Sequence, residues 1–185
     1  MFIQTEATPN PATLKFLPGK VVMGEGTLDL RDASQATSSP LAQRLFAVSG
    51  VSGVFFGYDF VTVTKAEGEW QHLKPAILGA IMEHMMSGQP VMAGPPPVIA
   101  GEEEFFEESD AATVTTIKEL LESRIRPAVA GDGGDITFRG FRDGIVYLAM
   151  KGSCAGCPSS TATLKHGIQN LLKHFLPDVR EVQAI

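Results

Sequence analysis

Apolar and polar residues alternate in short runs along much of the chain, and this alternation predicts β-strands. The runs are bounded by glycine, proline, asparagine or aspartate, as strands usually are. Two of the runs form a hairpin around the turn at 57–59, and two more flank a turn at 142–144. The predicted strands are residues 2–6, 13–17, the two arms of the hairpin 54–65, 135–140, 144–152 and 179–183.

Apolar residues three or four positions apart predict four helices. The first begins at Ser39 and Pro40, with serine as the cap and proline at the first helical position, and runs to about residue 48. Gly88 is a typical stop after the second helix. The remaining helices are expected at residues 70–86, 113–127 and 158–175. The alternation of helices and strands predicts an α/β (α+β) fold.

A change of composition at residues 89–110 predicts two domains. Three consecutive prolines at 95–97 favour an extended backbone, and the acidic run at 102–110 repels itself and favours solvent. The chain is therefore expected to form two small mixed α/β domains, residues 1–88 and 111–185, joined by a Pro-rich acidic linker. Phe105 and Phe106 interrupt the acidic run, and we expect them to pack locally on one of the domains.

The composition excludes several classes of function. The 185 residues carry a formal net charge of −6 without a basic run, which argues against a nucleic-acid-binding protein. No stretch approaches the roughly 20 apolar residues of a membrane span. The first residues also lack the features of a signal or transit peptide. These observations predict a soluble protein of a reducing compartment.

The candidate chemistry lies in the only two cysteines, Cys154 and Cys157, which form a C-x-x-C pair. A predicted strand ends just before them, and Pro158 suits the first position of the following helix. Cys157 is therefore expected at or near the helix N-cap, where free amide groups and the helix dipole stabilise a thiolate. Small residues between the cysteines allow both sulfur atoms to point the same way.

Three interpretations of this pair stay open from the residues alone. A C-x-x-C at a helix start suits a dithiol–disulfide redox pair. A zinc site needs two more ligands, and His166 stands nine positions past Cys157, outside the usual spacing. An iron–sulfur cluster needs about four thiolates, so one pair per chain supplies them only if two chains meet around the cluster.

Other candidate residues are expected to be structural. Asp132 and Asp135 belong to a glycine-rich turn, GDGGD, which lacks the ligand pattern of a calcium loop. We expect its Gly133 and Gly134 to pack against the cysteine loop. The methionines near His84 are expected to fill the core. Lys151, Lys165, Ser159 and Ser160 are expected to be surface or capping residues.

Two stretches resemble a known family. Residues 126–169 contain RPxxxxDGGD, GSCAGCPSS and TLK, and they closely resemble the C-terminal domain of NifU, which is also found in Nfu-type iron–sulfur carriers. The N-terminal TPNPATLKFLPG resembles the N-terminal domain of the Nfu carriers. The two resemblances cover nearly the whole chain outside the linker, and the cysteine motif shows no departure from the family pattern.

The resemblance implies an iron–sulfur cluster carrier and not an enzyme. Cys154 and Cys157 from each of two protomers would hold one 4Fe–4S cluster in a homodimer. The protein would accept the cluster from an upstream scaffold and pass it to apo iron–sulfur enzymes, while the N-terminal domain recognises partners. The implied compartment is a bacterial cytoplasm, or the mitochondrial matrix for a processed organelle protein. The alternatives are a thiol–disulfide oxidoreductase and an interaction protein with zinc at a dimer seam.

Overall fold

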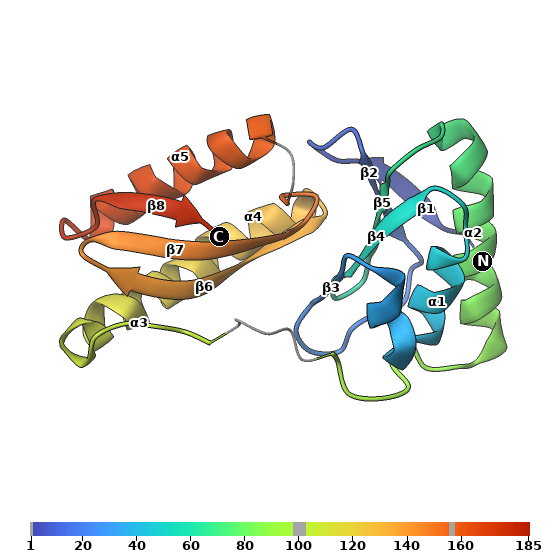
Figure 1. Ribbon diagram of the computed structural model, residues 1–185, viewed down its shortest axis with the longest axis horizontal. Coiled ribbons are helices and arrows are strands. Elements are labelled where there is room, and N and C mark those ends of the chain that lie inside the picture. Colours follow the sequence, from blue (N-terminus) through green and yellow to red (C-terminus); the bar gives the residue numbers. More distant parts are fainter. Residues whose placement is uncertain (1, 98–102, 156–157) are drawn as a thin grey trace. The chain divides into compact units, whose positions relative to one another are not determined.

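The structure is a computed structural model that describes residues 2–97, 103–155 and 158–185, with the side chains of residues 158–160 excepted. The chain divides into two compact units, Met1–Val98 and Ile99–Ile185 (Figure 1). Each unit combines a β-sheet with helices, which confirms the predicted α/β (α+β) class. No helix in the described ranges is long and apolar enough to cross a membrane.

The first unit is built on a five-stranded antiparallel sheet in the order β1-β2-β5-β4-β3. Two helices, α1 and α2, cover one face of this sheet (Figure 1). A 3-10 helix, η1, precedes α1. The elements are β1 (Gln4–Ala7), β2 (Thr13–Leu17), β3 (Leu28–Leu30), η1 (Ala33–Ser38), α1 (Pro40–Phe46), β4 (Val51–Phe56), β5 (Val61–Lys65) and α2 (Trp70–Ser87).

Predicted helix signals act as expected in this unit. The side chain of Ser39 accepts a hydrogen bond from the backbone N–H of Ala42, and Pro40 opens α1. Gly88 ends α2 in the left-handed conformation, with φ of 74°. Strand β3 and helix η1 were not predicted, because three and six residues are too short to show a periodic pattern.

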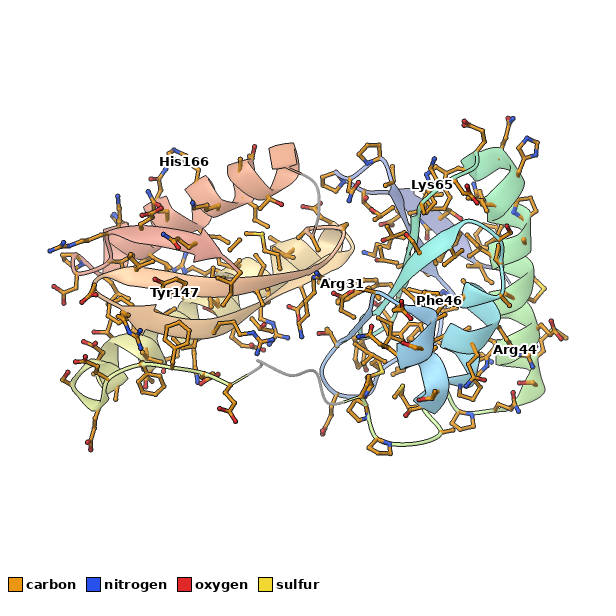
Figure 2. The ribbon with its side chains drawn as sticks, viewed as in Figure 1. Arg31, Arg44, Phe46, Lys65, Tyr147 and His166 are labelled. Atoms are coloured by element: carbon orange, nitrogen blue, oxygen red, sulfur yellow. The ribbon has the colours of Figure 1, made fainter. Side chains whose placement is uncertain are left out.

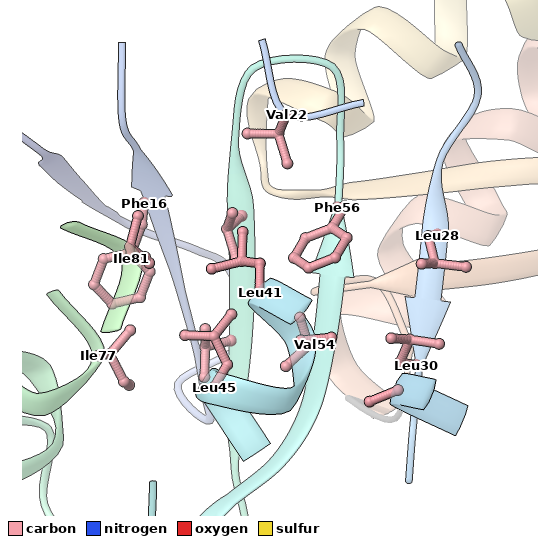
Figure 3. Close-up of a cluster of buried hydrophobic side chains, with 14 of the residues drawn as sticks. Phe16, Val22, Leu28, Leu30, Leu41, Leu45, Val54, Phe56, Ile77 and Ile81 are labelled. Atoms are coloured by element: carbon pink, nitrogen blue, oxygen red, sulfur yellow. The ribbon is translucent and has the colours of Figure 1, made fainter. Parts of the chain in front are cut away.

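The core of the first unit lies between the sheet and its two helices (Figure 3). The predicted stripe of α2 is buried at Leu73, Ile77 and Ile81, and Met85 packs at its margin. The largest fully buried side chains facing them include Phe16, Phe56, Leu41 and Leu45. Complete burial of such side chains contributes roughly 1.5–3 kcal/mol each, so their packing between sheet and helices is a large stabilising contribution to this unit.

The second unit is built on a three-stranded sheet in the order β6-β7-β8. β6 and β7 form an antiparallel hairpin, and β8 pairs with β7 in parallel after the crossover helix α5. The core residues come from the helices and from one face of the sheet. The elements are η2 (Glu108–Asp110), α3 (Ala111–Leu120), the π-helical turn η3 (Leu121–Ile125), α4 (Arg126–Gly131), β6 (Gly134–Arg142), β7 (Ile145–Gly152), α5 (Pro158–Phe175) and β8 (Glu181–Ala184).

The helix that opens this unit does not end at Pro127 as predicted. It continues as α4 to Gly131, because η3 rearranges the backbone just before the proline and Pro127 falls in the first turn of α4. A proline in the first turn removes a donor that has no helical partner there. The longer helix brings its end directly to the GDGGD turn.

The described ends of the predicted linker make contacts with the units. The backbone N–H of Ala93 donates to the carbonyl of Ser38 at 2.8 Å. Phe105 pairs with the edge of β6: its N–H donates to the Arg139 carbonyl, and its carbonyl accepts from the Phe141 N–H, both at 2.9 Å. The Phe105 ring lies 5.1 Å from the ring of Tyr147. Local packing of Phe105 is therefore confirmed.

Candidate functional site

The cysteine loop connects the end of β7 to the start of α5, as predicted. β7 ends at Gly152, whose φ of 65° turns the chain into the loop, and α5 begins at Pro158. Cys154 is described two residues after the turn. Cys157 lies outside the described residues, so its expected position at the helix N-cap stays a prediction.

Cys154 lies inside the second unit. Its side chain is only 6% exposed and belongs to the same apolar cluster as Met150 and Ile168. Burial raises the pKa of the thiol to about 11, the negative charges of Asp132 and Asp135 act in the same direction, and a hydrogen bond with Ser153 opposes them. At neutral pH the side chain is therefore a protonated thiol. A metal that binds it as a thiolate must release that proton.

The GDGGD turn packs against the cysteine loop, which confirms the prediction for its glycines. The backbone N–H of Ser153 donates to the carbonyl of Gly133 at 3.3 Å. The Ser153 hydroxyl donates to the carbonyl of Asp132 at 2.5 Å. Gly133 has φ of 84°, a conformation that side-chain-bearing residues rarely adopt. The turn is thus a backbone support for the loop.

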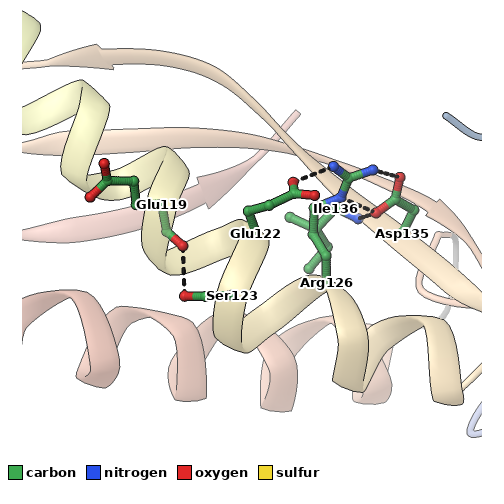
Figure 4. A network of polar contacts seen from close by, with 6 residues as sticks. All are labelled: Glu119, Glu122, Ser123, Arg126, Asp135 and Ile136. Atoms are coloured by element: carbon green, nitrogen blue, oxygen red, sulfur yellow. Dashed lines mark hydrogen bonds and ion pairs between the residues drawn. The ribbon is translucent and has the colours of Figure 1, made fainter. Parts of the chain in front are cut away.

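Asp135 is structural, as expected, and its partner is Arg126. The guanidinium of Arg126 donates to both carboxylate oxygens of Asp135, from Nε at 2.8 Å and from the second terminal nitrogen at 2.9 Å (Figure 4). Asp135 is 3% exposed and also accepts from the Ile136 N–H at 2.8 Å. Arg126 makes a further ion pair with Glu122 at 2.6 Å. These hydrogen bonds raise the pKa of Arg126.

The Arg126–Asp135 pair ties α4 to the first residues of β6, at the strand end that supports the cysteine loop. Sequence reasoning did not single out Arg126, although it stands in the RPxxxxDGGD stretch. The spacing of nine residues between the partners was the available signal. This spacing predicts an ion pair only if the helix is known to continue past Pro127 and to lead directly into β6.

Among the residues that the structure describes, the other candidate ligands do not gather around Cys154. His166 is exposed and projects from α5 (Figure 2). Lys165 lies 3.6 Å from Glu181 in an ion pair. Within the described residues no group of three or more histidine, cysteine, aspartate or glutamate side chains is placed to hold a metal ion. Of the two thiols expected to bind a cluster, the described part of the chain thus contains one, that of Cys154.

The methionines of helix α2 fill the core only in part. Met85 packs against the core as expected, whereas Met86 is 74% exposed. His84 is 1% exposed, and neither ring nitrogen has a hydrogen-bond partner within the described residues. Burial lowers its pKa, and the positive charge of Arg44 adds to that effect. His84 is therefore a buried residue of the first unit that is not hydrogen-bonded within the described part of the chain.

The comparisons with known proteins agree with both halves of the chain. The family described as "Scaffold protein Nfu/NifU N terminal" matches residues 3–88, and the "NifU-like domain" matches residues 117–183. The NFU1 iron-sulfur cluster scaffold homolog of Drosophila erecta, named mitochondrial, is 52% identical over 187 residues, covering 100% of this chain and 65% of that protein.

Two further relatives extend this likeness. The human protein of the same name is 50% identical, with coverage of 100% of this chain and 72% of the relative. NifU-like protein 4, mitochondrial, of Arabidopsis thaliana is 50% identical over 186 residues, covering 99% of this chain and 65% of that protein. The chain thus spans about two thirds of the length of these relatives, and it belongs to the Nfu family of iron–sulfur cluster scaffold proteins.

Proposed function

We propose that the chain is a carrier that binds a 4Fe–4S cluster through Cys154 and Cys157 of two protomers and transfers it to apo iron–sulfur proteins. Membership of the scaffold family supports iron–sulfur cargo. The single observation that carries the shared site is the shortage of ligands. The sequence has two cysteines, and the described residues hold no other group of metal-binding side chains.

Four thiolates are the usual ligand set of a cubane cluster, so one chain supplies half of it. A two-fold pairing of identical chains completes the set without any other residue. A cluster held between two surface loops remains accessible to incoming thiolates, which suits transfer. The described site fits such cargo in kind, because a soft sulfur donor at the end of β7 is what iron–sulfur clusters require.

The role proposed is delivery of cargo and not catalysis. The partners are a second copy of the chain, an upstream scaffold that donates the cluster, and apo-proteins that receive it. The first unit, which the family model for the Nfu N terminus matches, is proposed to recognise partners. The three relatives are named mitochondrial, which supports the mitochondrial option for the compartment; none of them supports the bacterial cytoplasm.

The redox alternative finds no support at Cys154. An attacking thiol in an oxidoreductase has a lowered pKa and partial exposure, because the thiolate is the nucleophile. Cys154 shows the opposite: burial raises its pKa to about 11. A buried thiol with a high pKa is a poor nucleophile until its surroundings open.

Anaerobic reconstitution with iron and sulfide tests the proposal. The full chain should bind about four iron and four sulfide per dimer, with the iron eluting at the size of a dimer. Cys154→Ala or Cys157→Ala should each remove the bound iron, whereas Ser123→Ala, on the exposed side of η3, should not. An iron-free monomer whose dithiol cycles with a thiol reductant would instead establish the oxidoreductase. Zinc without sulfide would establish the structural-zinc interpretation.

A further inference from the structure

The thiol of Cys154 is seated against a glycine at the start of β6. A Cβ atom built on Gly134 would lie 2.7 Å from Cys154 Sγ and 3.2 Å from the Cys154 nitrogen. Carbon and sulfur atoms do not approach this closely without a bond, so only glycine leaves room for the thiol here. Gly134 is itself buried within the sheet.

The backbone on both sides of Cys154 is tied down. On one side, Ser153 is 1% exposed, and its hydroxyl donates to the Asp132 carbonyl at 2.5 Å. On the other side, the Thr161 hydroxyl in α5 donates to the carbonyl of Cys154 at 3.0 Å. The side chain between these ties points into the apolar cluster of the unit.

This arrangement conflicts with the geometry that cluster binding demands. Iron bound between two chains lies outside each of them, so a ligand must present its sulfur at the surface. With 6% of its surface exposed, the side chain of Cys154 does not do so in this structure. The thiol of Cys154 must therefore have two positions, one inside the unit and one at its surface.

We propose that Gly134 and Ser153 are positioning residues that hold Cys154 in a sheltered resting position, and that loading of the cluster draws the thiol outward. Only the outward position depends on the proposed function. The sheltered position is supported by the contacts of Gly134, Ser153 and Thr161 described above. Burial lowers the reactivity of the thiol toward reagents in solution, because it reacts only during the fraction of time that it is exposed. Substitutions that weaken the contacts of Gly134 and Ser153 should therefore expose the Cys154 thiol and speed the binding of iron.

The test measures the reactivity of Cys154 in the full-length, metal-free chain carrying Cys157→Ser, so that a single cysteine remains. Iodoacetamide is added, and mass spectrometry follows the formation of the carbon–sulfur bond with loss of iodide and release of the thiol proton. Cys154 should react at least about tenfold more slowly in the native protein than in guanidinium. Ser153→Ala should raise the native rate about fivefold or more, because it removes the bond to Asp132 without adding bulk.

Gly134→Ala should raise the rate as well, but its Cβ would also lie 2.7 Å from the Lys151 carbonyl and strain the strand pair. Ser153→Ala therefore decides the question if circular dichroism shows that the glycine variant is unfolded. The matched controls are Ser123→Ala, an exposed serine, and Gly167→Ala, at which nothing lies within 4 Å of an added Cβ. Both should leave the rate unchanged.

Two outcomes would overturn the proposal: a native Cys154 that reacts as fast as in guanidinium, or a folded Ser153→Ala variant that reacts as slowly as its parent. Iron binding is measured separately on chains that keep Cys157. A chain that shelters Cys154 but binds no iron would refute the proposed function and leave the resting position standing. A chain that binds iron with a freely reactive Cys154 would refute the resting position alone. With both intact, Ser153→Ala should load iron faster than the native chain.

Discussion

Replacing Asp135 with alanine should destabilise the second unit and leave the first unaffected. The substitution removes the acceptor of two hydrogen bonds from Arg126, at 2.8 and 2.9 Å, and of one from the Ile136 N–H. Asp135 is 3% exposed, so the Ile136 N–H loses this acceptor in a place from which water is excluded. Arg126 keeps its ion pair with Glu122.

The magnitude follows from these contacts. Breaking one side of a buried ion pair costs about 3–5 kcal/mol. Arg126 retains 31% side-chain exposure and a second carboxylate, which together offset part of that cost. We therefore expect a loss of about 3 kcal/mol, which corresponds to a drop of roughly 12–24 °C in the melting temperature of a domain of this size.

Scanning calorimetry of the full chain resolves the two units if each unfolds in its own transition. Trp70, the only tryptophan, lies in α2 and reports on the first unit by fluorescence. The control is Glu122→Gln, which removes a carboxylate that is 70% exposed and should cost less than about 1 kcal/mol. If Asp135→Ala cost no more than this control, the buried pair would not support the turn beneath the cysteine loop.

Two further predictions concern other parts of the chain. Phe105→Ala should lower the free energy of unfolding of the second unit, measured in urea, by about 1–3 kcal/mol, because the ring fills the space beside β6. Phe106→Ala should cost less, because that side chain is 41% exposed. Equal losses would show that Phe105 has no specific packing site on β6. The stability of the first unit, followed by Trp70 fluorescence in urea, should fall as the pH drops below about 6.5, since unfolded chains protonate His84 there while burial and Arg44 lower its pKa in the folded state. His84→Leu should flatten this pH dependence, and an unchanged slope would place its cause elsewhere.

The local signals of the chain were sufficient for most of the fold. Ser39 and Pro40 open a helix, Gly88 closes one, and the turn at 142–144 joins a hairpin. Each of these signals acts through the conformation of one or two residues, so it can be read without knowing the rest of the molecule. The helical stripe of α2 is equally local, because its period alone places Leu73, Ile77 and Ile81 on one face.

The places where sequence reasoning fell short involve contacts between distant residues. The three residues of β3 are a strand only because they pair with β4. The helix passes Pro127 because η3 and the first turn of α4 remove the need for its missing donor. Burial of His84 without a hydrogen-bond partner among the described residues also depends on how α2 packs, which no local pattern of residues encodes.

The candidate site divides in the same way. The C-x-x-C spacing, the strand before it and the proline after it were by themselves enough to propose Cys154 and Cys157 as the candidate ligands, because ligand number and loop context can be read from the sequence. Only the tertiary structure decided that Cys154 is buried, since the pairing of β6 with β7 brings Gly134 beside its thiol and the GDGGD turn beside Ser153. Burial and pairing are properties of the folded chain, because they depend on atoms brought together from distant positions.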